Sequence, residues 1–88
     1  IKEFIDFKKI IDQSKFSYDE IENFYFFPSK RWDIEFKNNI FIKLPMINSK
    51  NSLDYVFEFL ANKNLKNNLT IDARVKGQII FNDSRIGF

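Results

Sequence analysis

The stretch KRWDIEFKNNIFIKLP, residues 30–45, decides the fold, because apolar and polar residues alternate on both sides of a pair of asparagines. The apolar residues of the first half share one face of a strand: Trp32, Ile34 and Phe36. Those of the second half share one face of a return strand: Ile40, Ile42 and Leu44. A two-residue turn would set Ile34 opposite Lys43 and mix the faces, whereas a three-residue loop at 37–39 keeps the apolar residues on one side. We therefore predict a β-hairpin with a three-residue loop and a left-handed Asn39.

Amphipathic helices are predicted before and after this hairpin. Residues 1–12 place four apolar side chains at helical spacing: Ile1, Phe4, Ile5 and Ile11. Residues 48–64 contain apolar side chains at positions i, i+3, i+4 and i+7: Leu53, Val56, Phe57 and Leu60. We expect both apolar faces to pack against the core.

Further strands are predicted on either side of the second helix. The four consecutive aromatic residues at 24–27 suit a strand that is buried on both faces, or one that meets a partner. Apolar and polar residues alternate over 69–76, Gly77 marks a turn, and residues 78–82 form the return strand. Residues 83–88 are expected to be a tail.

Helices interspersed with antiparallel hairpins predict an α+β domain, in which helices pack on one face of a mostly antiparallel sheet. The 88 residues suffice for one small domain. Apolar residues make up 44% of the chain and twelve residues are Phe, so a packed core is expected and disorder is not.

The composition argues against catalysis. The chain has no Cys and no His, and so it lacks thiolate ligands and the commonest general base. Its serines have no His to activate them, and no cofactor or metal motif is present. The carboxylates of Asp33, Glu35 and Asp72 alternate with apolar residues, which is typical of a solvated strand face. We expect neither an enzyme nor a bound cofactor or metal.

A nucleic-acid role is the alternative hypothesis. Lys30 and Arg31 precede Trp32, and a basic pair beside an aromatic ring can hold a phosphate and stack a base. Arg74 would extend this surface. However, the net charge is only +2 and the basic residues are spread among acidic ones. The competing interpretation places Trp32 in the core.

The last strand is the feature that most favours protein binding. Its sequence, QIIFN at 78–82, is apolar and contains neither Pro nor a charge. If this strand lies at the sheet edge, its unpaired backbone groups can be completed by a strand from another chain. The alternative is that neighbouring residues of the same chain cover the edge.

Three blocks of the sequence resemble the end of the β-domain of the FtsQ/DivIB family of bacterial cell-division proteins. RWDIEFKNNIFIKLP is similar to the family's RRWD…L.NG..V.LP block, with Asn39 where the family has Gly. The helix that contains Leu53 follows, and IDARV at 71–75 matches the family's IDLR strand, with Ala73 in place of Leu. The resemblance covers about residues 16–82.

The resemblance implies a non-catalytic role in septum formation. In this family the β-domain lies on the periplasmic side of the inner membrane, and it binds FtsB and FtsL through strand addition at the last strand. On this basis residues 1–82 would be part of such a β-domain, in a piece of a longer protein whose membrane anchor lies elsewhere. The implied partner-binding residues are Lys30, Arg31, Arg74, Val75, Gly77, Gln78, Ile79, Ile80 and Phe81.

Overall fold

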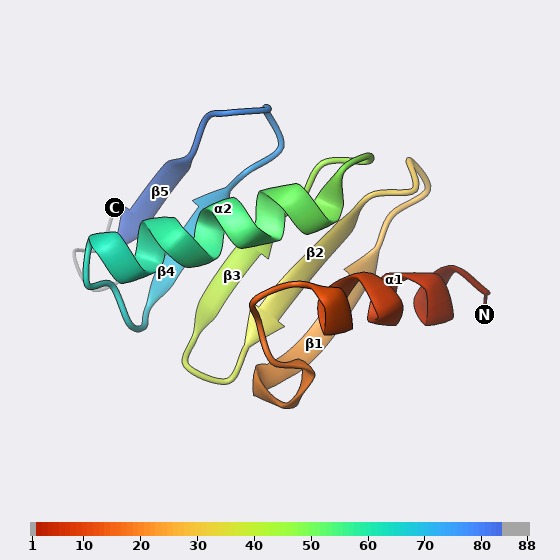
Figure 1. The fold of residues 1–88 in the computed structure, drawn as a ribbon, viewed down its shortest axis with the longest axis horizontal. Helices are drawn as coiled ribbons and strands as arrows, with labels where there is room; N and C mark the ends of the chain where they lie inside the picture. The colour runs from red at the N-terminus through yellow and green to blue at the C-terminus, as the bar shows by residue number, and fades with distance from the viewer. Residues whose placement is uncertain (1, 84–88) are drawn as a thin grey trace.

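A computed structural model describes residues 2–83, which form a five-stranded sheet with two helices on one face (Figure 1). The elements, in chain order, are α1 (Lys2–Gln13), the 3₁₀ turn η1 (Tyr18–Glu20), β1 (Ile21–Phe26), β2 (Trp32–Phe36), β3 (Ile40–Lys43), α2 (Ser49–Asn62), β4 (Leu69–Asp72) and β5 (Ile80–Asp83). The predicted α+β class is confirmed. Neither helix in residues 2–83 has the length and apolar content needed to cross a membrane.

The β2–β3 hairpin has the predicted register. Ile34 pairs with Ile42 across the two strands, and residues 37–39 form the loop. Asn39 has a φ of 64°, and its N–H donates to the carbonyl of Phe36 at 3.0 Å. An asparagine tolerates this left-handed conformation better than most other non-glycine residues, so the three-residue loop needs no glycine.

The strands lie in the order β1-β2-β3-β4-β5, and one pair of them is parallel. β3 and β4 run in the same direction, with Ile42 opposite Ile71, whereas the other three pairs are antiparallel. The sequence analysis did not predict the parallel pair. It arises because α2 carries the chain back along the sheet between β3 and β4, as a crossover helix does.

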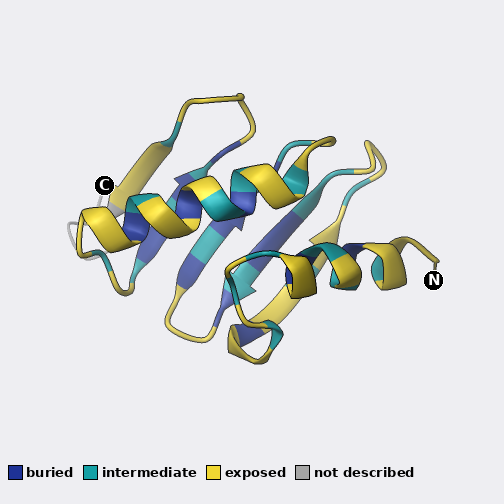
Figure 2. Cartoon of the chain, viewed as in Figure 1, coloured by how far each residue is buried: buried dark blue, intermediate teal, exposed yellow. Residues whose placement is uncertain are grey.

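The core lies between the sheet and the two helices. Figure 2 shows buried residues along the central strands and exposed residues on the outward faces of both helices. On α1, Ile11 is buried as predicted, but Phe7 is buried where Ile5 was expected, and Ile5 is 55% exposed. On α2, Leu53, Val56 and Leu60 are buried, but Phe57 lies at the margin and contacts the Phe16 ring.

The first edge of the sheet is β1, and of the two alternatives for residues 24–27 the structure contradicts a strand that is buried on both faces. Tyr25 and Phe26 are exposed, and only Phe24 packs against the core. Among residues 2–83, β1 pairs with β2 alone. One side of its backbone is therefore unpaired there.

The last hairpin is shorter than predicted. β4 ends at Asp72, residues 73–79 form a loop, and β5 begins at Ile80. Gly77 lies in the loop with a φ of 73°, as a turn residue should. β5 includes Asp83, the first residue of the expected tail, and residues 84–88 lie outside the described part of the chain.

Candidate functional site

Seven of the nine residues predicted to bind a partner lie at two turns on the same end of the sheet. Lys30 and Arg31 belong to the β1–β2 turn, where Lys30 has a φ of 70°. Five of the others lie in the 73–79 loop: Arg74, Val75, Gly77, Gln78 and Ile79. Gly77 was predicted at a turn, but the other four were predicted on strands. Only Ile80 and Phe81 lie on β5.

A row of side chains crosses all five strands on the face that carries no helix. Cross-strand pairing places its members side by side: Tyr25, Asp33, Lys43, Asp72 and Ile80. The charges in this outer row alternate in sign. β2 and β4 run in opposite directions, so Arg31 and Arg74 lie at the same end of the sheet, beyond Asp33 and Asp72 respectively.

Asp33 is buried, which contradicts the prediction of a solvated carboxylate. It is only 3% exposed and forms an ion pair with Arg31. The Arg31 guanidinium lies over the Phe27 ring, 4.6 Å from its centre, and so closes the carboxylate off from water. Burial raises the pKa of Asp33, and the positive charge of Arg31 opposes that shift. The Arg31 guanidinium is thus already engaged in contacts within this domain, with Asp33 and the Phe27 ring.

Arg74 forms a two-pronged ion pair with Asp72. Its Nε donates to Oδ1 at 2.9 Å and its Nη2 donates to Oδ2 at 2.6 Å. These bonds outweigh partial burial and lower the pKa of Asp72 to about 2. Because the Arg74 side chain is about half exposed, the pair lies at the surface, and Nη1 takes no part in it.

We expect Arg74→Gln to return the pKa of Asp72 toward its ordinary value of 3.8. In the wild type the folded-state pKa is depressed, so this carboxylate stabilises the fold above pH 3.8. That contribution is lost as the pH falls toward 2. An NMR titration of the side-chain carboxyl groups measures the change, with Asp54, which pairs with Lys50, as the internal control. An unchanged Asp72 pKa would contradict the pairing.

The free edge of β5 can be located from the hydrogen bonds of β4. The N–H of Leu69 donates to the carbonyl of Asn39, and that of Ala73 to the carbonyl of Lys43. These alternate positions of β4 therefore bond toward β3. The intervening positions, Thr70 and Asp72, bond to the other neighbour, β5.

Asn82 and Ile80 oppose Thr70 and Asp72, and so they carry the β5 backbone groups that bond to β4. The N–H and carbonyl groups of Phe81 therefore point to the free edge. No other strand of residues 2–83 pairs there. Within residues 2–83, β5 thus lies at the edge of the sheet, as the strand-addition alternative requires.

The side chains of β5 leave apolar surface on both faces beside this edge. Phe81 lies on the helix-bearing face, where its ring contacts the Phe59 ring edge-on at 5.3 Å, and it is still 42% exposed. Ile80 lies on the opposite face and is 56% exposed. A segment added at this edge would find apolar contacts above and below the sheet.

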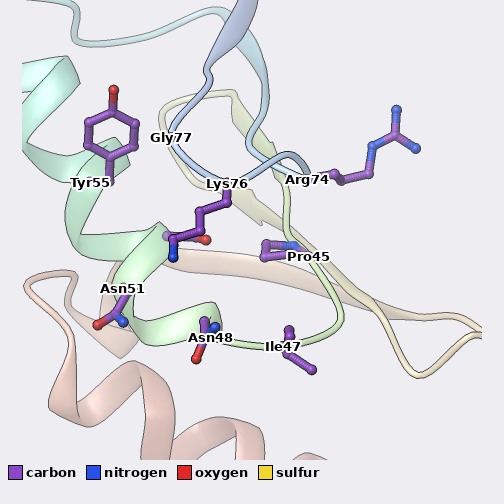
Figure 3. A pocket seen from close by; sticks show the side chains of 9 residues that line it. Pro45, Ile47, Asn48, Asn51, Tyr55, Arg74, Lys76 and Gly77 are labelled. Carbon is purple, nitrogen blue, oxygen red and sulfur yellow. The ribbon is translucent and has the colours of Figure 1, made fainter.

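Two hollows flank the 73–79 loop. The smaller, of about 250 Å³, is lined by Asp72, Arg74, Val75, Gln78 and Ile80, four of which are predicted site residues. The larger, of about 490 Å³, lies between the loop and the start of α2 (Figure 3). Residues 45–55 form much of its wall. Sequence reasoning missed them, because they resembled a helix start and gave no sign that the loop would reach them.

Trp32, part of the alternative nucleic-acid hypothesis, faces the helices. Its ring stacks on Phe7 with centres 4.7 Å apart and planes within 3°. The rings of Phe24 and Phe26 also contact it. The Trp32 ring is thus engaged with α1 and β1. Residues 2–83 contain no group of His, Cys, Asp or Glu side chains that could hold a metal ion.

No family model matches the sequence, and no curated protein or solved structure is significantly similar to it. The class of this domain, an α+β sheet with helices on one face and an unpaired β5 edge within residues 2–83, therefore rests on its own geometry.

Proposed function

We propose that this chain is a non-catalytic protein-interaction domain that binds an extended segment of a partner by strand addition at β5. The observation that carries the proposal is the backbone of Phe81, whose N–H and carbonyl point away from β4. Strand addition satisfies such groups by main-chain hydrogen bonds, and alternate side chains on the sheet supply specificity. Exposed Ile80 and Phe81 are placed to supply those contacts.

We further propose that the partner is the FtsB–FtsL pair of the bacterial divisome, on the periplasmic side of the inner membrane. The support is the resemblance to the FtsQ/DivIB family, whose three blocks fall on successive elements here. The RWD block forms β2 and β3, the helix is α2, and IDAR spans the end of β4 and the start of the 73–79 loop. In that arrangement β5 is the last strand, which is the strand that the family uses for its partner.

Arg74 would contribute a charged contact near this edge. It already pairs with Asp72, but the Arg74 side chain is about half exposed and its Nη1 is left for a partner carboxylate. Arg31 is less available, because it is folded over Asp33 and Phe27. Of these two arginines, Arg74 is thus the more accessible to a carboxylate of the partner.

The nucleic-acid alternative receives less support. Stacking of bases needs an accessible aromatic ring, and Trp32 lies against Phe7. Backbone phosphates need uncompensated cations, and Arg31 and Arg74 each have a carboxylate partner. No contact among residues 2–83 favours this second function.

A pair of substitutions at Phe81 tests strand addition. Phe81→Ala and Phe81→Pro both remove the ring, but only Pro removes the N–H that faces the edge. Proline is tolerated on an edge strand when its missing N–H faces outward. We expect Phe81→Pro to bind the periplasmic FtsB–FtsL segment at least about tenfold more weakly than Phe81→Ala. Proline removes one main-chain hydrogen bond to the added segment, and its fixed φ limits how far β5 can adjust to that segment.

Calorimetric titration at two salt concentrations measures this difference, and circular dichroism confirms that both variants fold. Equal affinities for the Ala and Pro variants would contradict strand addition at β5. A folded wild-type chain that does not bind the segment would contradict the identity of the partner. Binding of polynucleotide that weakens steeply with salt would instead support the alternative.

A further inference from the structure

The larger pocket is built from three separate parts of the chain. Pro45, Ile47 and Asn48 come from the connection between β3 and α2, and Asn51, Ser52 and Tyr55 come from the first half of α2. Arg74, Lys76 and Gly77 come from the 73–79 loop. Its volume of about 490 Å³ falls in the range of sites that bind small molecules or single side chains with their flanking backbone.

The apolar part of this pocket is exposed. Ile47 is 68% exposed and Tyr55 is 49% exposed, and both line the pocket beside Pro45. Large apolar side chains that gather around a hollow on the surface favour the burial of an apolar group from a ligand. The aromatic ring of Tyr55 supplies both a flat apolar surface and a hydroxyl group.

The charged part of the pocket is entirely basic. None of the nine lining residues is Asp or Glu. Figure 3 shows the Lys76 side chain running toward the first turn of α2, whereas the Arg74 guanidinium points away from the hollow. Arg74 is paired with Asp72, but no ion pair involves Lys76 among residues 2–83. Lys76 is therefore the cation that a ligand would meet.

The remaining lining groups suit a peptide backbone. Asn48 and Asn51 each offer an amide that both donates and accepts, and the Asn48 side chain does not cap α2. Ser52 adds a hydroxyl with the same double capacity. A peptide unit, which carries one donor and one acceptor, is complementary to such groups.

We propose that this pocket binds an acidic segment of a partner protein, in which an apolar side chain enters between Ile47 and Tyr55 and a neighbouring carboxylate meets Lys76. The argument rests on charge complementarity, on the apolar wall and on the amide groups together. It depends on the proposed function only in that the ligand belongs to a protein. The pocket contains neither Ile80 nor Phe81, so it is distinct from the β5 edge.

Three capped tetrapeptides test the proposal by NMR titration of the isotope-labelled 88-residue chain. The probe is acetyl-Ala-Leu-Glu-Ala-amide, and the controls replace Glu by Gln or Leu by Ala. We expect the probe to shift the amide signals of Asn48, Asn51 and Gly77. We also expect each control to bind about five- to tenfold more weakly, which corresponds to the loss of one partly desolvated contact.

Variants of the chain locate the contact. Lys76→Gln should remove the preference for Glu over Gln in the peptide, whereas Lys66→Gln, on an exposed loop outside the pocket, should leave it intact. Phe81→Pro should not alter peptide binding, so this result is independent of strand addition. Equal affinity for the Glu and Gln peptides, or signal shifts confined to other residues, would overturn the proposal.

Discussion

Trp32→Ala is expected to lower the free energy of unfolding by about 3 kcal/mol, at the low end of the range for truncating a large core aromatic residue. Trp32 is only partly buried, but its ring stacks on Phe7, which is 2% exposed. Removal of the ring would uncover α1 at the point where the helix meets β2. For a domain of 88 residues this loss is a large share of the total stability.

Urea unfolding followed by circular dichroism measures the effect, and Tyr55→Ala is the matched control. Tyr55 is an exposed aromatic residue, so its truncation should change the free energy of unfolding by less than about 1 kcal/mol. If the two variants were equally stable, Trp32 would not be part of the scaffold. The nucleic-acid hypothesis would then regain its aromatic residue.

Arg31→Ala is expected to destabilise the fold by about 2–3 kcal/mol, because it leaves the buried carboxylate of Asp33 without its cation. This loss in the free energy of unfolding is smaller than that expected for a fully buried ion pair, because part of the Arg31 side chain is exposed. The double variant Arg31→Ala/Asp33→Asn removes the unpaired charge. It should therefore recover part of the loss in urea unfolding.

The loss in unfolding free energy caused by Arg31→Ala should also depend on pH. Burial raises the pKa of Asp33 in the folded state, and loss of the Arg31 charge raises it further. A raised carboxyl pKa favours the fold below the unfolded-state value, and this contribution is lost as the pH rises through the folded-state value. The difference in unfolding free energy between variant and wild type should thus shrink as the pH is lowered. A deficit that is constant between pH 7 and pH 4 would contradict the buried charge.

The β2–β3 hairpin could be predicted from the sequence because its apolar pattern has only one consistent register. A shift by one residue would place Lys43 opposite Ile34 on the same face, so burial and turn geometry point to the same loop. The face of α1 was harder to predict. Ile5 and Phe7 both lie among apolar neighbours, and the choice between them depends on where Trp32 sits, which lies far away in the chain.

The parallel pairing of β3 and β4 and the short β4 could not be predicted from local pattern. Alternation continues through Val75, yet pairing stops at Asp72 because β5 opposes only four residues. The same limit applies to the candidate site. The edge position of β5 was foreseen, whereas the pocket around Tyr55 depends on a contact between α2 and a loop some twenty residues later. The burial of Asp33 likewise depends on Arg31 folding back over it.

The strands lie in the sheet in the same order as in the chain, so each strand can join a neighbour that is already in place. Three of the four pairs of neighbouring strands are joined by turns or short loops, and only the β3–β4 connection, through α2, is long. Mixed α/β domains with such a topology fold at intermediate rates. β5 lies at the edge of this sheet, and its side chains at positions 80–82 are all exposed. It can therefore detach and rejoin at a cost well below that of global unfolding, while the other four strands stay in place.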